Sequence, residues 1–146
     1  MASLEVARSL LGEQHPAVAT SLNNLAALYL SQGHYEQAEP LFIQALRIGI
    51  QTLGEAHPDV AVRLNNLALL YETVERYAEA EPLYLQAIAI FYQRLGEAHP
   101  YTQQTWQEFV YFLYQVMQSD QLSELSDHPM TRWLLQDLQK HRIRER

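Results

Sequence analysis

Three histidines recur along the chain at an interval of 42 residues: His15, His57 and His99. Imidazole is a common zinc ligand, so evenly spaced histidines raise the possibility of a metal site. An interval of this length, however, places each histidine in a different structural unit, and neighbouring packed helices stand about 10 Å apart. Two imidazoles that far apart cannot ligate one ion. We therefore predict no metal site and expect each histidine to satisfy backbone groups at a junction.

No other residue pattern points to catalysis. The chain contains no cysteine, which excludes disulfides, thiolate metal sites and cysteine nucleophiles. The sequence also contains no carboxylate pair, HExxH, Ser-His-Asp order, Walker loop or GxGxxG fingerprint. We expect a protein that is not an enzyme and that binds no cofactor.

Charge narrows the class of partner. The chain of 146 residues carries a net charge of −7, whereas nucleic acids and anionic membranes are bound chiefly by Lys and Arg. We therefore expect a protein or peptide partner that is neutral or basic, and neither nucleic acid nor membrane. The sequence has no apolar run long enough to span a bilayer and no secretory signal pattern, so we expect a cytoplasmic location.

The histidines belong to a longer repeat. The segment LGEQHP at 11–16 returns as LGEAHP at 53–58 and at 95–100. In each of the first two units, two apolar stripes at helical spacing follow the junction. The first stripe is Leu22, Leu25, Ala26 and Tyr29, repeated as Leu64, Leu67, Ala68 and Tyr71; the second is Ala38, Leu41, Phe42 and Ala45, repeated as Ala80, Leu83, Tyr84 and Ala87. Each unit is therefore predicted to be two antiparallel helices joined by a short turn.

The period also predicts how the chain is divided. The expected parts are a remnant second helix at 1–10, full units at 11–52 and 53–94, the first helix of a partial third unit at 95–118, and a C-terminal turn with a capping helix at 119–146. Terminal units of solenoids are atypical, and we expect Pro129–Arg142 to form the cap, with a solvated basic end at 140–146. The predicted fold is all-α: an α-α superhelix of antiparallel helix pairs with an atypical C-terminal capping helix.

The two-helix unit, with its LNNLA and AEPL segments, resembles the tetratricopeptide repeat. The 42-residue period and the LGEAHP junction resemble the kinesin-light-chain type of that repeat. This resemblance implies a right-handed superhelix whose first helices line a concave surface that holds extended or partly helical peptides. It also implies that the second Asn of the LNNL segment, Asn24 or Asn66 here, hydrogen-bonds the backbone of the ligand.

Helical geometry independently selects the same face. At 100° per residue, the leucines of LNNL point to the core and the asparagines lie outside it, where an amide offers both donors and an acceptor to a peptide backbone. The predicted groove residues are Thr20, Asn23, Asn24, Ala27 and Ser31 in the first unit, Val62, Asn65, Asn66, Leu69 and Thr73 in the second, and Gln104, Glu108 and Tyr111 in the third, with Arg63 as the only cation at the edge. Glu108 replaces the Asn that the resemblance implies, which disfavours a carboxylate terminus there.

The resulting hypothesis is a non-catalytic scaffold whose concave face, built on 16–32, 58–74 and 100–118, binds a segment of a partner protein. Asn24 and Asn66 would clamp the backbone of that segment. Two alternatives stay open. One is self-association as a homodimer through the N-terminal edge, where Leu4, Val6 and Leu11 form an apolar stripe. The other is that the chain is the regulatory C-terminal part of a larger multidomain protein.

Overall fold

The computed structural model describes the backbone of residues 2–144 and the side chains of residues 4–141, so part of the basic end at 140–146 lies outside the described residues. Within these bounds the fold is all-α, as predicted. The helices are α1 (Ala2–Leu11), α2 (Pro16–Ser31), α3 (Tyr35–Leu53), α4 (Pro58–Thr73), α5 (Tyr77–Leu95), α6 (Pro100–Met117), the short 3₁₀ helix η1 (Leu122–Glu124) and α7 (Pro129–Arg144).

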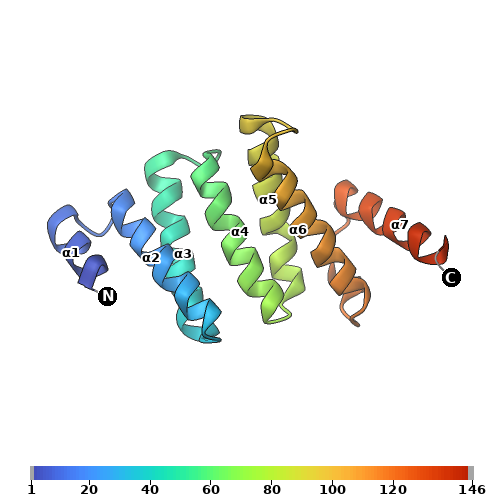
Figure 1. Ribbon diagram of the computed structural model, residues 1–146, viewed down its shortest axis with the longest axis horizontal. Helices are drawn as coiled ribbons and strands as arrows, with labels where there is room; N and C mark the ends of the chain where they lie inside the picture. The colour runs from blue at the N-terminus through green and yellow to red at the C-terminus, as the bar shows by residue number, and fades with distance from the viewer. Residues whose placement is uncertain (1, 145–146) are drawn as a thin grey trace.

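The helices form an elongated array in which α2, α4 and α6 make one layer and α3 and α5 lie behind it (Figure 1). Packing is most extensive within the pairs α2–α3 and α4–α5, and each pair then packs on the next through α3–α4 and α5–α6. This arrangement is the predicted solenoid of antiparallel helix pairs. At its C-terminal end α7 leaves the array at an angle beside α6 (Figure 1).

The core repeats with the sequence. In the first unit, Val18, Ala19 and Leu22 of α2 are buried against Ala45 and Ile48 of α3. In the second unit, the residues 42 positions later do the same: Val60, Ala61 and Leu64 of α4 are buried against Ala87, Ile90 and Phe91 of α5. The second half of each second helix therefore covers the first half of the first helix of its own unit.

Each junction histidine caps a helix. The Nδ1 atoms of His15, His57 and His99 accept hydrogen bonds from the backbone N–H two residues later, at 3.0, 3.0 and 3.1 Å. A proline follows at the first helical position, where a missing N–H is harmless. The structure therefore confirms that these histidines satisfy backbone groups.

A fourth junction of the same kind begins α7, and the sequence pattern did not reveal it. His128 Nδ1 accepts from the N–H of Met130 at 3.1 Å, directly before Pro129. This His-Pro pair lies 29 residues after His99-Pro100 rather than 42. The interval is short because only residues 118–128, with η1, lie between α6 and α7. The third unit therefore lacks a second helix of its own, and α7 begins in the manner of a first helix.

Removing one cap should have a modest and specific effect. His57→Ala should lower the free energy of unfolding by about 1 kcal/mol, because the N–H of Asp59 loses its acceptor at the start of α4. His57→Asn keeps a side-chain acceptor and should retain most of that stability. Urea denaturation of both variants checks this, and equal losses in the two would argue against the capping role.

Candidate protein-interaction groove

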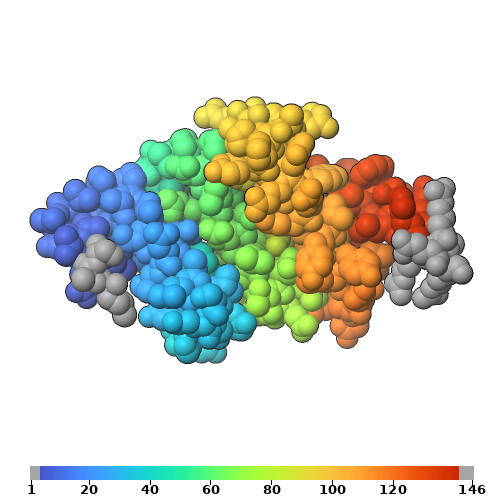
Figure 2. Space-filling view, in the orientation of Figure 1, coloured from blue at the N-terminus to red at the C-terminus, as the bar shows by residue number. Residues whose placement is uncertain are grey.

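The groove face consists of the exposed side chains that α2, α4 and α6 carry at equivalent positions. Figure 2 shows the three helices next to one another on the near face, coloured blue, green and orange. Thr20, Val62 and Gln104 form one row across them, and Ala27, Leu69 and Tyr111 form another; all six are exposed. The large apolar members of the face keep 39% (Val62), 42% (Leu69) and 59% (Tyr111) of their surface exposed. The face therefore offers apolar contacts as well as polar ones.

The LNNL asparagines connect neighbouring units. Asn66 Nδ2 donates to Asn23 Oδ1 at 3.2 Å, and Asn65 Nδ2 donates to Glu108 Oε2 at 2.7 Å. Asn24 is exposed and makes no side-chain hydrogen bond to any described residue. Helical geometry alone suggested that the four asparagines are equivalent, but in the structure they differ. Asn24 is open to solvent, whereas the side chains of the other three form hydrogen bonds between helices.

Glu108 places a carboxylate in the groove between α4 and α6. Besides the bond from Asn65, its Oε1 accepts from Gln104 Nε2 at 3.0 Å. A hollow of about 240 Å³ lies beside it, lined by Val62, Asn65, Asn66, Phe91, Tyr101, Gln104, Thr105 and Glu108. Five of these eight residues belong to the predicted groove set; Phe91, Tyr101 and Thr105 do not. The hollow combines an apolar wall with acceptor-rich amide and carboxylate groups.

The side chain of Arg63, which the sequence predicts as a cation at the groove edge, is half-buried and bonded to the neighbouring unit. Its Nη1 donates to the carbonyl oxygen of Ala19 at 3.0 Å, and its stem passes over Gly49, about 3.4 Å from where a Cβ would stand. Burial lowers the pKa of Arg63, while the nearby charge of Asp59 acts in the opposite direction. One unit later the same two positions hold Phe91 and Thr105, both buried. Gly49 packs beside the large Arg63, whereas the large Phe91 packs beside the smaller Thr105. The two pairs therefore fill a similar volume.

Two buried glutamates support the groove helices from behind, and sequence reasoning did not single them out. The first is Glu72 of α4, whose Oε1 accepts a hydrogen bond from the Tyr84 hydroxyl at 2.9 Å. Burial raises the pKa of Glu72; the bond from Tyr84 lowers it, and the negative charge of Glu108 raises it further. Glu108 lies on the groove face, so a charge in the groove affects the pKa of Glu72 in the core.

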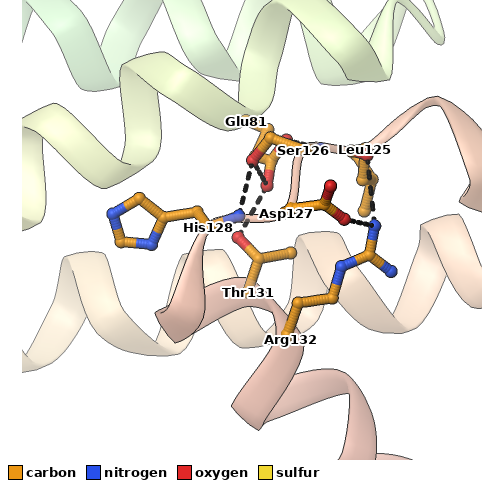
Figure 3. Close-up of polar contacts among 7 residues, drawn as sticks. All are labelled: Glu81, Leu125, Ser126, Asp127, His128, Thr131 and Arg132. Atoms are coloured by element: carbon orange, nitrogen blue, oxygen red, sulfur yellow. Dashed lines mark hydrogen bonds and ion pairs between the residues drawn. The ribbon is translucent and has the colours of Figure 1, made fainter.

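The second is Glu81 of α5, which fastens α7 to the solenoid (Figure 3). Its carboxylate accepts from the backbone N–H of Ser126 at 2.7 Å, the Ser126 hydroxyl at 2.8 Å and the Thr131 hydroxyl at 2.6 Å. Glu81 is 2% exposed and Thr131 is completely buried. A buried carboxylate needs such donors to replace its hydration, so these three bonds fix the segment that leads into α7.

Among the described residues, no three His, Asp or Glu side chains come together in a way that could hold a metal ion. In the same part of the chain, no helix is both long enough and apolar enough to cross a membrane.

Comparisons with known proteins agree with this architecture. The family model described as Tetratricopeptide repeat matches twice, over residues 18–59 and 60–101. The chain is similar to the crystal structure of BtubC (BKLC) from P. vanneervenii, with a TM-score of 0.72 and 22% identity over 94% of this chain and 61% of that one. This chain therefore spans less than two thirds of the length of BtubC.

A second solved structure gives the same result at a slightly higher identity. It is a putative kinesin light chain with nearly identical TPR-like repeats from Podosopora anserina, with a TM-score of 0.66 and 26% identity over 90% of this chain and 70% of that one. A variant of the same protein with one substituted residue gives the same values. No curated protein sequence matches the chain significantly. Because the two family matches together cover more than half of its residues, the protein belongs to the tetratricopeptide repeat family, and its 42-residue repeats are similar in fold to those of the kinesin-light-chain-like structures above.

Proposed function

We propose that the groove face binds a segment of a partner protein in an extended or partly helical conformation. Tetratricopeptide repeats form a scaffold suited to protein–protein interaction and are generally not catalytic. The observation that carries the proposal is the row of equivalent exposed side chains on α2, α4 and α6, with the hollow between α4 and α6 beside it. A polypeptide laid across the three helices would meet the same kinds of group in each unit.

The chemistry of the face favours a neutral or basic segment. Asn24 and the free oxygen of Asn66 suit the alternating donors and acceptors of a peptide backbone. Glu108 adds a negative charge, and Arg63, committed to the Ala19 carbonyl, does not offset it at the surface. Val62, Leu69 and Tyr111 give apolar side chains of the partner a place to pack. A shallow face of this size fits micromolar rather than nanomolar binding.

The asparagine clamp predicts a specific loss of binding. A library of random 12-residue peptides selected on the wild-type protein supplies the probes, and their Kd values are then measured by fluorescence anisotropy. The double variant Asn24→Ala, Asn66→Ala should weaken binding at least tenfold, because both backbone contacts disappear. Its stability should fall by only about 1 kcal/mol, since one partly buried hydrogen bond to Asn23 is lost.

A matched control tests whether the loss of binding is specific to amides of the groove face or follows from removing any two exposed amide side chains. Gln51 and Gln86 are exposed amides on α3 and α5, away from the groove face. The double variant Gln51→Ala, Gln86→Ala should bind the selected peptides as the wild type does. Unchanged affinity in the asparagine variant, or an equal loss in the glutamine variant, would remove the clamp from the proposal.

A second candidate function is self-association through α1. Three large apolar side chains of this helix are exposed: Val6 (53%), Leu10 (76%) and Leu11 (48%). In the two full units, the residue equivalent to Val6 is Ile48 or Ile90, and both are buried. An apolar helix face of this kind can pair with a second copy.

A further inference from the structure

A second and larger hollow lies on a different face of α6 from the groove. It measures about 770 Å³ and is bounded by α5, the first half of α6 and the start of α7. Its lining residues are Ile88, Ala89, Tyr92, Gln93, Glu97, Thr102, Gln103, Trp106, Gln107 and Met130. The floor is thus mainly apolar, the rim consists of side-chain amides, and Glu97 is the carboxylate among the lining residues. We call this site the C-terminal hollow.

The repeat shows what covers the equivalent surface elsewhere. The α6 residues Thr102, Gln103 and Trp106 correspond to Val60, Ala61 and Leu64 of α4 and to Val18, Ala19 and Leu22 of α2. In both full units, these positions are buried beneath the second half of the second helix. In the third unit, Trp106 stays half-buried and Tyr92 is 58% exposed. The C-terminal hollow is therefore the place that the second half of a second helix would take.

The cap explains why this place stays open. Residues 118–128 replace the second helix of the third unit, and Glu81 holds Ser126 and Thr131 against the first half of α5. Buried side chains of α7 such as Leu134 and Leu135 then pack into the core formed by α5 and the second half of α6. The side chains beyond, around Ile88 and Trp106, receive only Met130 from α7. A buried Thr102 hydroxyl there has no hydrogen-bond partner among the described residues.

We propose that the C-terminal hollow binds a short amphipathic helix of a partner protein, seated as the second half of a second helix is seated in the full units. The helix runs parallel to α5 and spans about three turns, roughly 15 Å. It carries a small residue at the position of Ala87 and branched or aromatic residues at the positions of Ile90 and Phe91. Its C-terminal end meets Glu97, which favours a basic residue in the last turn, where α5 itself has Arg94.

A partner helix fits better than a second copy of this chain. The helix α1 has the matching register, but α2 follows it after only four residues and is packed on it through Leu4. A docked copy would have to place α2 beside α6, on the side where α7 packs (Figure 1). An isolated helix brings no such neighbour.

The test uses a synthetic peptide with the sequence of residues 82–95, which contains Arg94 and no tryptophan. The protein carries Trp133→Phe, so that Trp106 in the hollow is its single tryptophan. Titration should give a saturable blue shift of Trp106 emission with a Kd of tens of micromolar, and a scrambled peptide should give none. Ala89→Arg fills the hollow and should weaken binding at least tenfold. Ala78→Arg, at an exposed position in the first turn of α5, should change Kd less than twofold.

Three results would overturn the proposal. The first is equal binding by the Ala89→Arg and wild-type proteins, and the second is saturation without a change in Trp106 emission. The third is concentration-dependent dimerisation in sedimentation equilibrium that both Ala89→Arg and Leu10→Glu abolish, because that would assign the hollow to a second copy. The variant Asn24→Ala, Asn66→Ala should bind the helical peptide normally, so this test is independent of the groove.

Discussion

Replacing Glu81 with alanine should lower the free energy of unfolding by about 3 kcal/mol and release α7 from the solenoid. The carboxylate accepts three hydrogen bonds, and donors that bond a charged acceptor each contribute about 1.5–3 kcal/mol without being fully additive. After truncation, the buried Thr131 hydroxyl and the Ser126 N–H lose their acceptor. No other carboxylate of the described residues bonds these groups, so nothing replaces the lost contact.

The position 42 residues earlier supplies a matched control. Glu39 accepts from the Tyr71 hydroxyl and from Arg76, but 28% of its side chain is exposed. Water can therefore replace part of what Glu39→Ala removes, and we expect a loss of about 1 kcal/mol. Urea denaturation measures both variants, and limited proteolysis should cut Glu81→Ala faster within 118–128. Equal stability losses, or unchanged cleavage, would show that Glu81 does not hold the cap.

The helices were predictable because their information is local and repeated. Leu22, Leu25 and Ala26 recur at the same phase 42 residues later. Leu22 and Ala26 are buried in the structure, so this stripe correctly indicates where the helix lies and which face it buries. The His-Pro and Gly signals then define the ends. The first helices end at Ser31, Thr73 and Met117, one residue before the predicted Gln32, Val74 and Gln118, because those residues serve as C-caps.

The polar pairs could not be predicted in the same way. Asn66 meets Asn23 and Asn65 meets Glu108 across 43 residues, one more than the repeat period, and the period alone does not contain this offset. Arg63 turned inward because Gly49 leaves room for its stem. A glycine in the middle of a helix is unfavourable by about 1 kcal/mol, so Gly49 was the available signal. For Glu81, the available signal was an acidic residue inside an apolar stripe, which indicates a buried carboxylate. The sequence could not name its hydrogen-bond donors, because Ser126 lies 45 residues away.

The second large effect is expected at the buried pair of Tyr84 and Glu72. Tyr84→Phe should cost about 2 kcal/mol at pH 7, because it removes the hydrogen bond that the Tyr84 hydroxyl donates to the Glu72 carboxylate in the core. Burial raises the pKa of Glu72 above its ordinary value of 4.5, and the Tyr84 bond acts against that shift. Without the bond the charged form is buried at greater cost, whereas the protonated form is little affected. The cost of Tyr84→Phe should therefore shrink as the pH falls.

The sign of the pH dependence distinguishes this pair from an ordinary salt-bridged carboxylate. A group whose pKa is raised on folding contributes stability that is complete below its unfolded value near 4.5 and is lost as the pH rises through the folded value. Glu72→Gln removes the charge while keeping an oxygen for the Tyr84 hydroxyl, so it should be at least as stable as the wild type at pH 7. That advantage should disappear towards pH 4.5. Urea denaturation of wild type, Tyr84→Phe and Glu72→Gln between pH 7 and pH 4.5 gives these differences directly, and pH-independent differences would mean that Glu72 is not buried as a charge.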